Sequence, residues 1–209
     1  MLSASEGHLL RCRVCEDQRG VFKVNTMILK VDLPLPFVPH RGHPLASAQT
    51  FDTMPPPLTA EHMQIRPANA SDLPAMTRIV ATAYQKYTER IGKPPAPMLE
   101  DYAVHVRAHA AWVAEADGVT VGLIVLLPEQ DHLLLDNVAV DPAHHGRKIG
   151  RALLAFAESE AIRRGYPELR LYTHEKMTEN LVMYPALGWQ ETGRGEQAGY
   201  QRVFFRKHV

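Results

Sequence analysis

The sequence is poor in cysteine, and both of its cysteines lie near the start, at Cys12 and Cys15. A thiol nucleophile is therefore excluded from the rest of the chain. One Cys-x-x-Cys pair supplies only half of the ligands of a structural zinc site, and His8, His40 and His43 have no recognised spacing. We therefore interpret the two cysteines as incidental and expect no metal. A metal-dependent docking segment is the alternative.

An excess of charge of either sign is also missing, because 23 lysines and arginines balance 23 aspartates and glutamates. No net field therefore favours nucleic acid or an anionic membrane. No apolar run reaches the roughly 18 residues of a membrane-spanning helix, and the start lacks the basic-then-apolar pattern of a signal peptide. We therefore expect a cytoplasmic protein with no nucleic-acid partner and no membrane partner.

The first 62 residues lack helical periodicity and contain seven of the 16 prolines. Only the segment 20–33 has the pattern of a strand. We interpret residues 1–62 as an irregular N-terminal extension. It is a leader, a flexible extension, or the result of a start assigned too far upstream of Met63. Residues 63–209 are expected to form the functional domain.

From Met63 the pattern predicts a mixed α/β domain in the order β-α-α-β-β-β-α-β-α-β-β. Ser71 or Asp72 is expected to cap the first helix, and Asp117-Gly118 is expected to form a hairpin turn. The predicted strands are 63–68, the two arms of the hairpin 110–129, 132–140, 168–173, 189–192 and 200–207, and the predicted helices are 71–90, 98–108, 147–164 and 176–187.

The stretch AVDPAHHGRKIGRALL, residues 139–154, joins a predicted buried strand to a helix through a turn that contains glycine. The first amides of a helix lack intrahelical partners and favour an anion. A P-loop is excluded because Gly150 is followed by Arg151 and Ala152, which leaves no hydroxyl for magnesium. The glycine spacing does not match a dinucleotide-binding turn, and the strand is the fourth in the chain rather than the first.

The same stretch resembles the phosphate-binding motif of the GNAT superfamily of acetyl-CoA-dependent N-acetyltransferases. The strand end at 140–142 and Gly150 match that motif. His145 stands where glutamine or arginine is usual, and Lys148 stands where glycine is usual. We expect Lys148 to offer its amide from an α-helical conformation and its ammonium to a phosphate.

A second stretch, ENLVMYPALGW, resembles the family's other motif through Asn180, Tyr184, Gly188 and Trp189. Asn180 and Tyr184 are four residues apart, so they lie on one face of a short helix. The resemblance extends over residues 64–206. It implies a central mixed, mostly antiparallel sheet flanked by about four helices.

The resemblance further implies direct transfer of an acetyl group from acetyl-CoA to an amine, without a metal and without a covalent acyl-enzyme. It implies that backbone amides of the buried strand hold the pantetheine and polarise the thioester, and that the helix N-terminus holds the pyrophosphate. The implied acetyl-CoA residues are Val138, Ala139, Val140, His145, Gly146, Arg147, Lys148, Ile149, Gly150, Arg151, Asn180 and Tyr184.

Tyr184 is the general acid that the resemblance implies, because its position matches the tyrosine that the family places beside the sulfur. For the general base our first choice is Asp136, a carboxylate inside an otherwise apolar strand. Strand alternation predicts that Asp136 shares a face with Val138 and Val140, and that Asn137 points to the other face. The alternatives are His174, Glu100, His105, or ordered water with no single base.

The expected acceptor is a primary amine, and a small molecule is favoured over a protein amine. The predicted acceptor loops, 89–102 and 192–202, carry charges of both signs and indicate neither a polyamine nor a phosphorylated sugar. The competing hypothesis is a GNAT-fold binding module that has lost catalysis. Because family members often pair through sheet edges, the resemblance also implies a homodimer.

Overall fold

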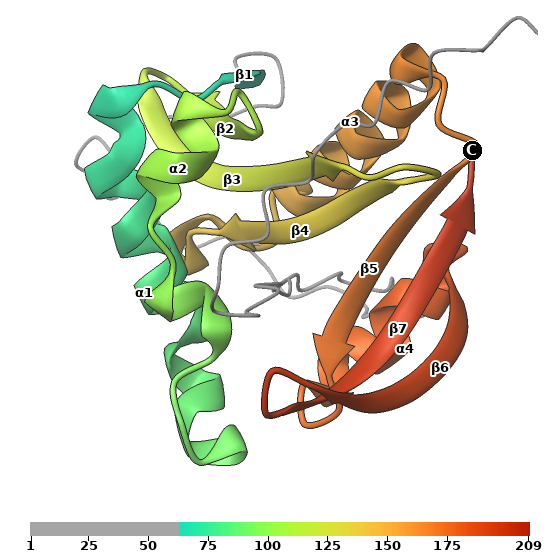
Figure 1. The fold of residues 1–209 in the computed structure, drawn as a ribbon. Coiled ribbons are helices and arrows are strands. Elements are labelled where there is room, and N and C mark those ends of the chain that lie inside the picture. The colour runs from blue at the N-terminus through green and yellow to red at the C-terminus, as the bar shows by residue number, and fades with distance from the viewer. Residues whose placement is uncertain (1–62) are drawn as a thin grey trace, which may run out of the picture.

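The computed structural model describes residues 63–209 (Figure 1). The cysteine pair and the segment 20–33 therefore lie outside the described residues. The strands are β1 (Met63–Pro67), β2 (Ala111–Ala116), β3 (Val119–Pro128), β4 (Leu133–Val140), β5 (Glu168–His174), β6 (Gln190–Gln197) and β7 (Tyr200–His208). The helices are α1 (Leu73–Ile91), α2 (Tyr102–Arg107), α3 (Ile149–Arg164) and α4 (Thr178–Ala186), with short 3-10 turns at Ala70–Asp72, Ala96–Leu99 and Pro142–His144.

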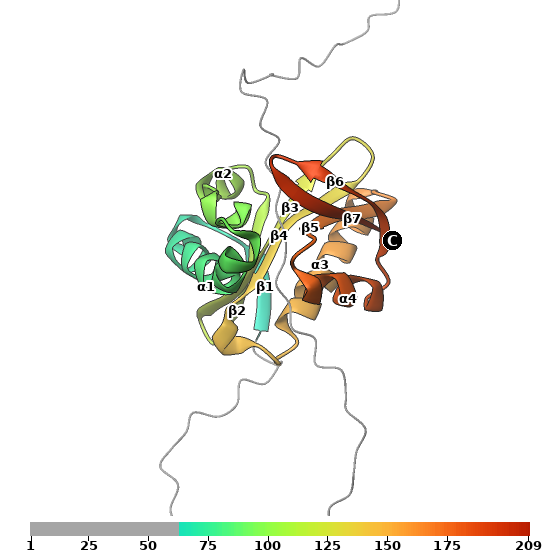
Figure 2. The same ribbon diagram turned by 90° about the horizontal axis from the view of Figure 1, so that it is seen from below.

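The seven strands form one sheet in the order β1-β2-β3-β4-β5-β7-β6. Every neighbouring pair is antiparallel except β4 and β5. Figure 2 shows α1 and α2 on one side of the sheet and α3 and α4 on the other. The predicted fold, a mixed and mostly antiparallel sheet flanked by four helices, is confirmed.

The start of α1 differs from the expected cap. The side chain of Asn69 accepts from the amide of Ser71, and the carboxylate of Asp72 accepts from the amide of Asn69, so the capping box begins two residues earlier than expected. Asp72 makes no side-chain cap on α1 itself and instead binds Arg66 at 2.8 Å. Asp72 occupies the N-cap position of α1, as predicted, but the expectation that its side chain or that of Ser71 caps the first amides of the helix is therefore wrong.

Most other boundaries are close to the predictions, but β6 extends to Gln197 rather than to residue 192, so most of the expected acceptor loop 192–202 lies in β6 and β7. The turn between β2 and β3 is formed by Asp117 and Gly118, with φ values of 50° and 75°, as expected for a tight hairpin. The second helix is shorter than predicted, because a 3-10 turn replaces its first residues and Asp101 caps α2 by accepting from the amide of Ala103.

The sheet separates two apolar clusters. Val138 and Val140 of β4 pack with Leu153 of α3 on one side, and Ala139 packs with Tyr84 of α1 on the other. This alternation is expected for a strand that is covered by helices on both faces. It also places every side chain of β4 in the interior, which explains its nearly continuous apolar sequence.

Strands β4 and β5 pair only at their first residues, where Leu133 lies opposite Leu169 and Leu134 opposite Arg170. Beyond these positions the two strands diverge like the arms of a V (Figure 1). The divergence leaves a break in the middle of the sheet, and both predicted motifs lie around it.

Candidate functional site

The edge of β4 that faces the break carries backbone groups without a strand partner in the described residues. Asp141 donates its amide to the carbonyl of Val121 on β3 at 2.9 Å. Hydrogen-bonded and non-hydrogen-bonded pairs alternate along an antiparallel ladder, so the amides of Val138 and Val140 point away from β3 and into the break. These are the two amides that the sequence analysis assigned to pantetheine.

The turn after β4 is held by Asp141. Its carboxylate accepts from the amide of Ala143 at 3.0 Å and from the guanidinium of Arg78 on α1 at 2.6 Å. Burial raises the pKa of Asp141, but the hydrogen bonds from Arg78 and Ala143 outweigh burial and leave the pKa below its ordinary value. The carboxylate therefore stays charged and anchors the turn at neutral pH.

The turn then enters α3 through two left-handed residues, Gly146 with φ 78° and Lys148 with φ 60°. The expectation that Lys148 is α-helical is therefore wrong. Lys148 is the N-cap of α3, and the first helical bond runs from Ala152 to its carbonyl. The left-handed region favours glycine because a Cβ crowds the following carbonyl, and this explains why glycine is usual at this position of the motif.

The N-terminus of α3 lies against β3 and β4 because Gly122 has no side chain. A Cβ at Gly122 would lie 3.0 Å from the carbonyl oxygen of Ala139 and 3.2 Å from Leu153. Ile149 and Gly150 are buried in this contact, whereas Gly146, Lys148 and Arg151 are exposed. The free amides at the start of α3 therefore sit on a rigid base and face outward.

For the remaining residues that were expected to bind acetyl-CoA, the side chains show no arrangement that points to the cofactor. Arg147 is exposed, and His145 is half-buried. Ala139 points its side chain toward α1, away from α3. Each of these assignments stays a prediction.

Tyr184 lies on α4, is fully buried, and belongs to the same apolar cluster as Val138 and Val140 of β4. Its ring packs on Trp189 and Phe205, with centroid separations of 5.8 and 5.4 Å. Within residues 63–209 its hydroxyl has no hydrogen-bond partner. Burial raises the pKa of Tyr184 well above its ordinary value, so the hydroxyl stays protonated.

Asn180, one turn earlier on α4, is also fully buried. Its amide nitrogen donates to the hydroxyl of Thr173 on β5 at 3.1 Å and contacts the sulfur of Met177 at 3.8 Å. The structure therefore gives Asn180 a place in tying α4 to β5. Its assignment to acetyl-CoA stays a prediction.

Asp136 does not share a face with Val138 and Val140, and the expectation that it does is wrong. Leu135 lies opposite Leu126, but Asn137 lies opposite Val125, so Asp136 is an extra residue in a β-bulge. A bulge resets the alternation of side chains, and a period of two cannot be carried across it.

The bulge turns Asp136 toward α2. Its carboxylate is fully buried and lies with the carboxylate of Glu100 and the imidazole of His105, all three reactive atoms within 4.8 Å of one another. His105 Nε2 is 3.3 Å from a carboxylate oxygen of Glu100. Asp136, Glu100 and His105, three of the four residues considered as the general base, thus form one cluster. At this spacing the three groups could share a proton or bind a cation.

Asn137 points to the face of α1 and α2, as expected, and it has a role that the sequence analysis missed. It accepts from the hydroxyl of Tyr84 at 2.8 Å and donates to the hydroxyl of Tyr102 at 2.6 Å. Tyr102 in turn donates to the carbonyl of Pro97 at 3.1 Å. The sequence did contain an indication of this role. An asparagine side chain within an apolar strand is buried, and a buried amide needs hydrogen-bond partners.

His174, the fourth base candidate, lies apart from this cluster. Its Nδ1 accepts from the amide of Lys176 at 3.1 Å, and its ring meets the ring of Tyr200 edge-on. Burial and the nearby positive charge of Arg202 lower the pKa of His174 below its ordinary value. The histidine is therefore neutral at physiological pH.

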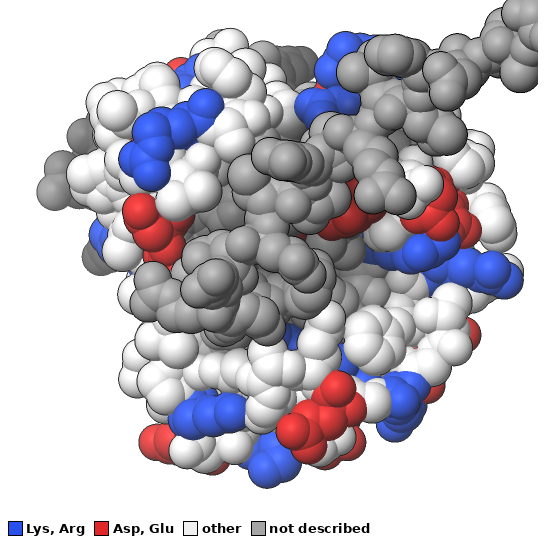
Figure 3. Space-filling view, viewed as in Figure 1, with Lys and Arg blue, Asp and Glu red and all other residues white. Residues whose placement is uncertain are grey.

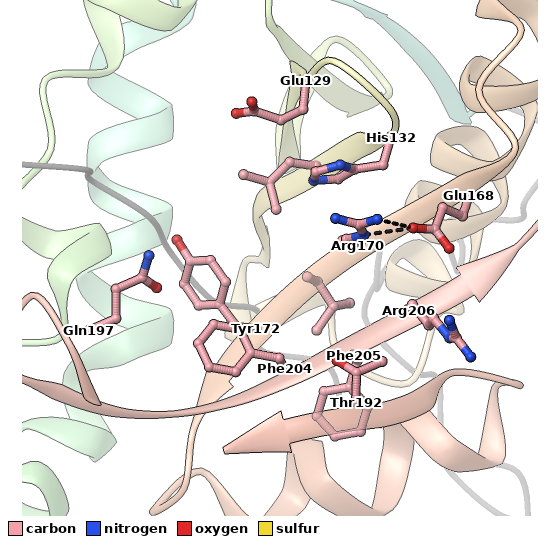
Figure 4. A pocket seen from close by; sticks show the side chains of 12 residues that line it. Glu129, His132, Glu168, Arg170, Tyr172, Thr192, Gln197, Phe204, Phe205 and Arg206 are labelled. Carbon is pink, nitrogen blue, oxygen red and sulfur yellow. Dashed lines mark hydrogen bonds and ion pairs between the residues drawn. The ribbon is translucent and has the colours of Figure 1, made fainter. Parts of the chain in front are cut away.

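A pocket of about 510 Å³ opens on the side of β5 and β7 that faces away from α4 (Figure 4). Tyr172 and Phe204 form an aromatic wall with ring centroids 5.8 Å apart. Arg170 and Glu168 form an ion pair at one end. The other lining residues are Glu129, His132, Leu134, Leu171, Thr192, Gln197, Phe205 and Arg206.

Two loops bridge the open end of the V. Lys93 donates to the carbonyl of Gly199 at 2.7 Å, and the hydroxyl of Tyr200 donates to the carbonyl of Pro94 at 2.8 Å. The loop after α1 is thereby joined to the turn between β6 and β7. Figure 3 shows lysines and arginines interspersed with aspartates and glutamates on this side of the molecule, in agreement with the mixed charge of the loops.

Comparison with known proteins agrees with this architecture. The PaiA N-acetyltransferase from Thermoplasma acidophilum, solved in complex with coenzyme A, superposes with a TM-score of 0.57 at 20% identity over 70% of this chain and 99% of that chain. The ribosomal-protein-S18-alanine N-acetyltransferase from Escherichia coli gives a TM-score of 0.56 at 21% identity over 70% of this chain and 94% of that chain. At these identities the likeness shows the fold.

Curated relatives match a shorter region. N-acetyltransferase family 8 member 3 from Rattus norvegicus is 36% identical over 88 residues, which cover 39% of this chain and 39% of the relative. N-acetyltransferase 8B from Homo sapiens is 33% identical over 89 residues, 40% of this chain and 39% of the relative. The match thus spans about two fifths of the length of these relatives.

No helix within residues 63–209 is both long and apolar enough to cross a bilayer. A model of the Acetyltransferase (GNAT) family matches residues 73–189, which include the break, the turn into α3 and Tyr184. With the fold and both motifs in place, the chain belongs to the GNAT family of acetyltransferases.

Proposed function

We propose that this protein transfers an acetyl group from acetyl-CoA to the nitrogen of a primary amine. The observation that carries the proposal is the break between β4 and β5. It presents two free strand amides, and the buried Tyr184 belongs to the same apolar cluster as Val138 and Val140. Relatives of the same fold were solved with coenzyme A or with acetyl-CoA bound, which supports a similar donor here.

The donor is held chiefly by backbone groups. The amides of Val138 and Val140 face the break, where they bind pantetheine and polarise the thioester carbonyl. Donors that are fixed in a site sheltered from water are often the largest contribution to catalysis. The free amides from Gly146 to Arg151 and the ammonium of Lys148 receive the pyrophosphate.

Asp136 removes a proton from the acceptor ammonium, and the nitrogen lone pair then attacks the thioester carbon. The tetrahedral intermediate collapses as the C–S bond breaks, and the hydroxyl of Tyr184 donates its proton to the departing thiolate. The second proton on nitrogen restores the tyrosine. Per turnover, one proton ends on sulfur and one leaves the protein.

The acceptor is a small-molecule amine that uses the pocket on β5 and β7. Its volume of about 510 Å³ is in the range of small-molecule sites. Tyr172 lines this pocket, and its raised pKa reflects burial first and then the negative charge of Asp136. The proposed base therefore lies behind the wall that Tyr172 forms, and Asp136 itself is fully buried.

Replacement of Tyr184 by phenylalanine tests the proposal. Loss of a general acid typically costs about 100-fold to 10,000-fold in rate, so Tyr184→Phe should turn over that much more slowly on any accepted amine. Calorimetric titration should give the same acetyl-CoA affinity as the wild-type chain. Tyr166→Phe, at the half-buried tyrosine just after α3, is the matched control and should keep full activity.

An unchanged rate in Tyr184→Phe would contradict the assignment of the acid. A full-length wild-type chain that binds acetyl-CoA but acetylates no member of an amine panel would favour the binding-module hypothesis. A chain that does not bind acetyl-CoA would show that His145 and Lys148 have closed the pyrophosphate site.

A further inference from the structure

We propose that His105 carries the proton that Asp136 removes from the amine to solvent, and that Glu100 orients the imidazole for this step. The proposal rests on the proposed function, since it concerns the fate of the proton released by acetyl transfer. The three groups lie close together although they come from different elements. Asp136 belongs to β4, His105 to α2, and Glu100 to the segment between the 3-10 turn Ala96–Leu99 and α2.

The need for such a route follows from the balance of the reaction. An ammonium and a thioester become an amide, a thiol and one free proton. Asp136 is fully buried, so a proton on its carboxylate has no direct path to water. A base that cannot return its proton to solvent stays protonated and cannot act in the next turnover.

His105 lies where an exit is needed. Its imidazole and the carboxylate of Asp136 are within 4.8 Å of each other. The side chain of His105 is 16% exposed, whereas that of Glu100 is 5% exposed. Among the three groups the histidine therefore connects the buried carboxylate to water, and imidazole is the side chain best suited to gain and lose a proton near neutral pH.

Glu100 positions the imidazole of His105 but does not itself carry the proton to solvent. Its carboxylate oxygen lies 3.3 Å from Nε2 of His105, so it accepts the ring N–H and stabilises the imidazolium that forms when a proton arrives. The His105 ring also packs on the ring of Tyr102 in a tilted arrangement, with centroids 6.1 Å apart. These two contacts fix the plane of the imidazole beside the bulge.

The other charged or titratable groups around Asp136 do not provide an alternative route. Burial raises the pKa of Tyr84, Tyr102 and Tyr172, which keeps these hydroxyls protonated at neutral pH. Arg202 of β7 is a permanent cation and accepts no proton. Within the described residues, the proton acceptors beside Asp136 are therefore Glu100 and His105.

The test uses the full chain with His105→Gln, a variant that keeps a donor for Glu100 but cannot carry a proton. We expect kcat to fall at least about 10-fold with acetyl-CoA affinity unchanged. Free imidazole in the buffer should restore part of the rate in this variant and leave the wild type unaffected. His109→Gln, at the exposed histidine just after α2, is the matched control and should behave as the wild type.

A rate in His105→Gln equal to that of the wild type across the pH range would overturn the proposal. A loss that imidazole does not rescue would also overturn it, because it would show that the side chain is needed only for structure.

A measurement without substrate separates this proposal from the proposed function. The imidazole resonances of His105, followed by NMR at fixed pH, should move in Asp136→Asn and in Glu100→Gln, because each variant changes a group that lies beside the ring. Resonances that stay in place would overturn the contact on which the proton route depends. Resonances that move in a chain that acetylates no amine would sustain the contact and reject only the acetyl-transfer proposal.

Discussion

The middle of β4 and the turn that follows the strand are built in different ways. In the middle of the strand, the bulge at Asp136 and Asn137 is buried, and Asn137 is held by side chains that reach it from α1 and α2. Beyond its end, the turn from Pro142 to Lys148 is largely exposed and places backbone amides rather than side chains. The same strand thus connects the bulge, which depends on contacts between side chains, to the turn, which depends on the conformation of its backbone.

This difference predicts different tolerance to change. In the bulge, both polar atoms of the Asn137 side chain have a specific buried partner, and loss of one partner leaves the other unsatisfied. In the turn, any residue that can adopt the required φ and ψ still offers its amide. The unusual His145 and Lys148 of this chain lie in the second region, and both are compatible with the fold of the family.

The largest effect is expected for Asn137→Leu. It removes the acceptor of Tyr84 and the donor to Tyr102, both in a buried environment. Each buried donor or acceptor left without its partner costs about 1–3 kcal/mol, so the loss of these two hydrogen bonds should lower the free energy of unfolding by about 2–6 kcal/mol. Chemical denaturation measures this change.

The double variant Tyr84→Phe with Asn137→Leu sharpens this prediction. Because the phenylalanine removes the orphaned hydroxyl, the double variant should be less destabilised than the sum of the two single variants. Strict additivity would show that the hydrogen bond of 2.8 Å contributes little to the free energy of unfolding.

Gly122→Ala should have the next largest effect and should act on the last residues of β4, because Gly122 lies opposite Val140. The new Cβ would meet the carbonyl oxygen of Ala139 at 3.0 Å, and this backbone atom cannot move without displacing the strand. Overpacking of this kind typically costs about 1–3 kcal/mol. Gly193→Ala on β6 is the control, since nothing lies within 4 Å of its added Cβ. Equal unfolding midpoints for the two variants would contradict the close contact.

Sequence patterns predicted the parts of the site that depend on regular periodicity. Asn180 and Tyr184 were placed on one face of α4 by their spacing, and both are buried there. The alternation of β4 placed Val138 and Val140 together correctly. In each case a helix or strand of constant period connects the residues that were compared.

The parts that were missed depend on breaks in that periodicity. The bulge adds one residue between Leu135 and Asn137, and nothing in the local sequence marks where the ladder is interrupted. The left-handed Lys148 was missed because propensity places lysine in a helix, although glycine, the residue that favours positive φ, is usual at this position of the motif. The bulge thus left no local signal, whereas the left-handed residue left one that helix propensity outweighed.

A smaller effect, dependent on pH, is expected for Asp141→Asn at the start of the turn. The pKa of Asp141 lies below its ordinary value of 3.8, so its ion pair with Arg78 stabilises the fold at higher pH. That contribution should be lost as the pH falls through the lowered pKa. Because Arg78 is 54% exposed, the effect is small.

Thermal unfolding of the wild type and of Asp141→Asn measures this effect. The difference between their Tm values should be constant near neutral pH and should shrink below about pH 4. Asp101→Asn is the control, because Asp101 also caps an amide but belongs to no ion pair within residues 63–209. A difference that persists at the lowest pH would assign the stabilisation to the cap on Ala143 rather than to Arg78.

The smallest effect is expected at Lys148, where Lys148→Gly and Lys148→Ala separate conformation from charge. Both variants lose the ammonium, but only the glycine relieves the left-handed strain at φ 60°. Lys148→Gly should therefore be more stable than Lys148→Ala by about 1 kcal/mol. Because the proposed site uses the ammonium of Lys148 as well as backbone amides, both variants should lose the same part of their acetyl-CoA affinity, most strongly at low salt. Unchanged affinity in both variants would show that the backbone amides of the turn hold the pyrophosphate without the lysine charge.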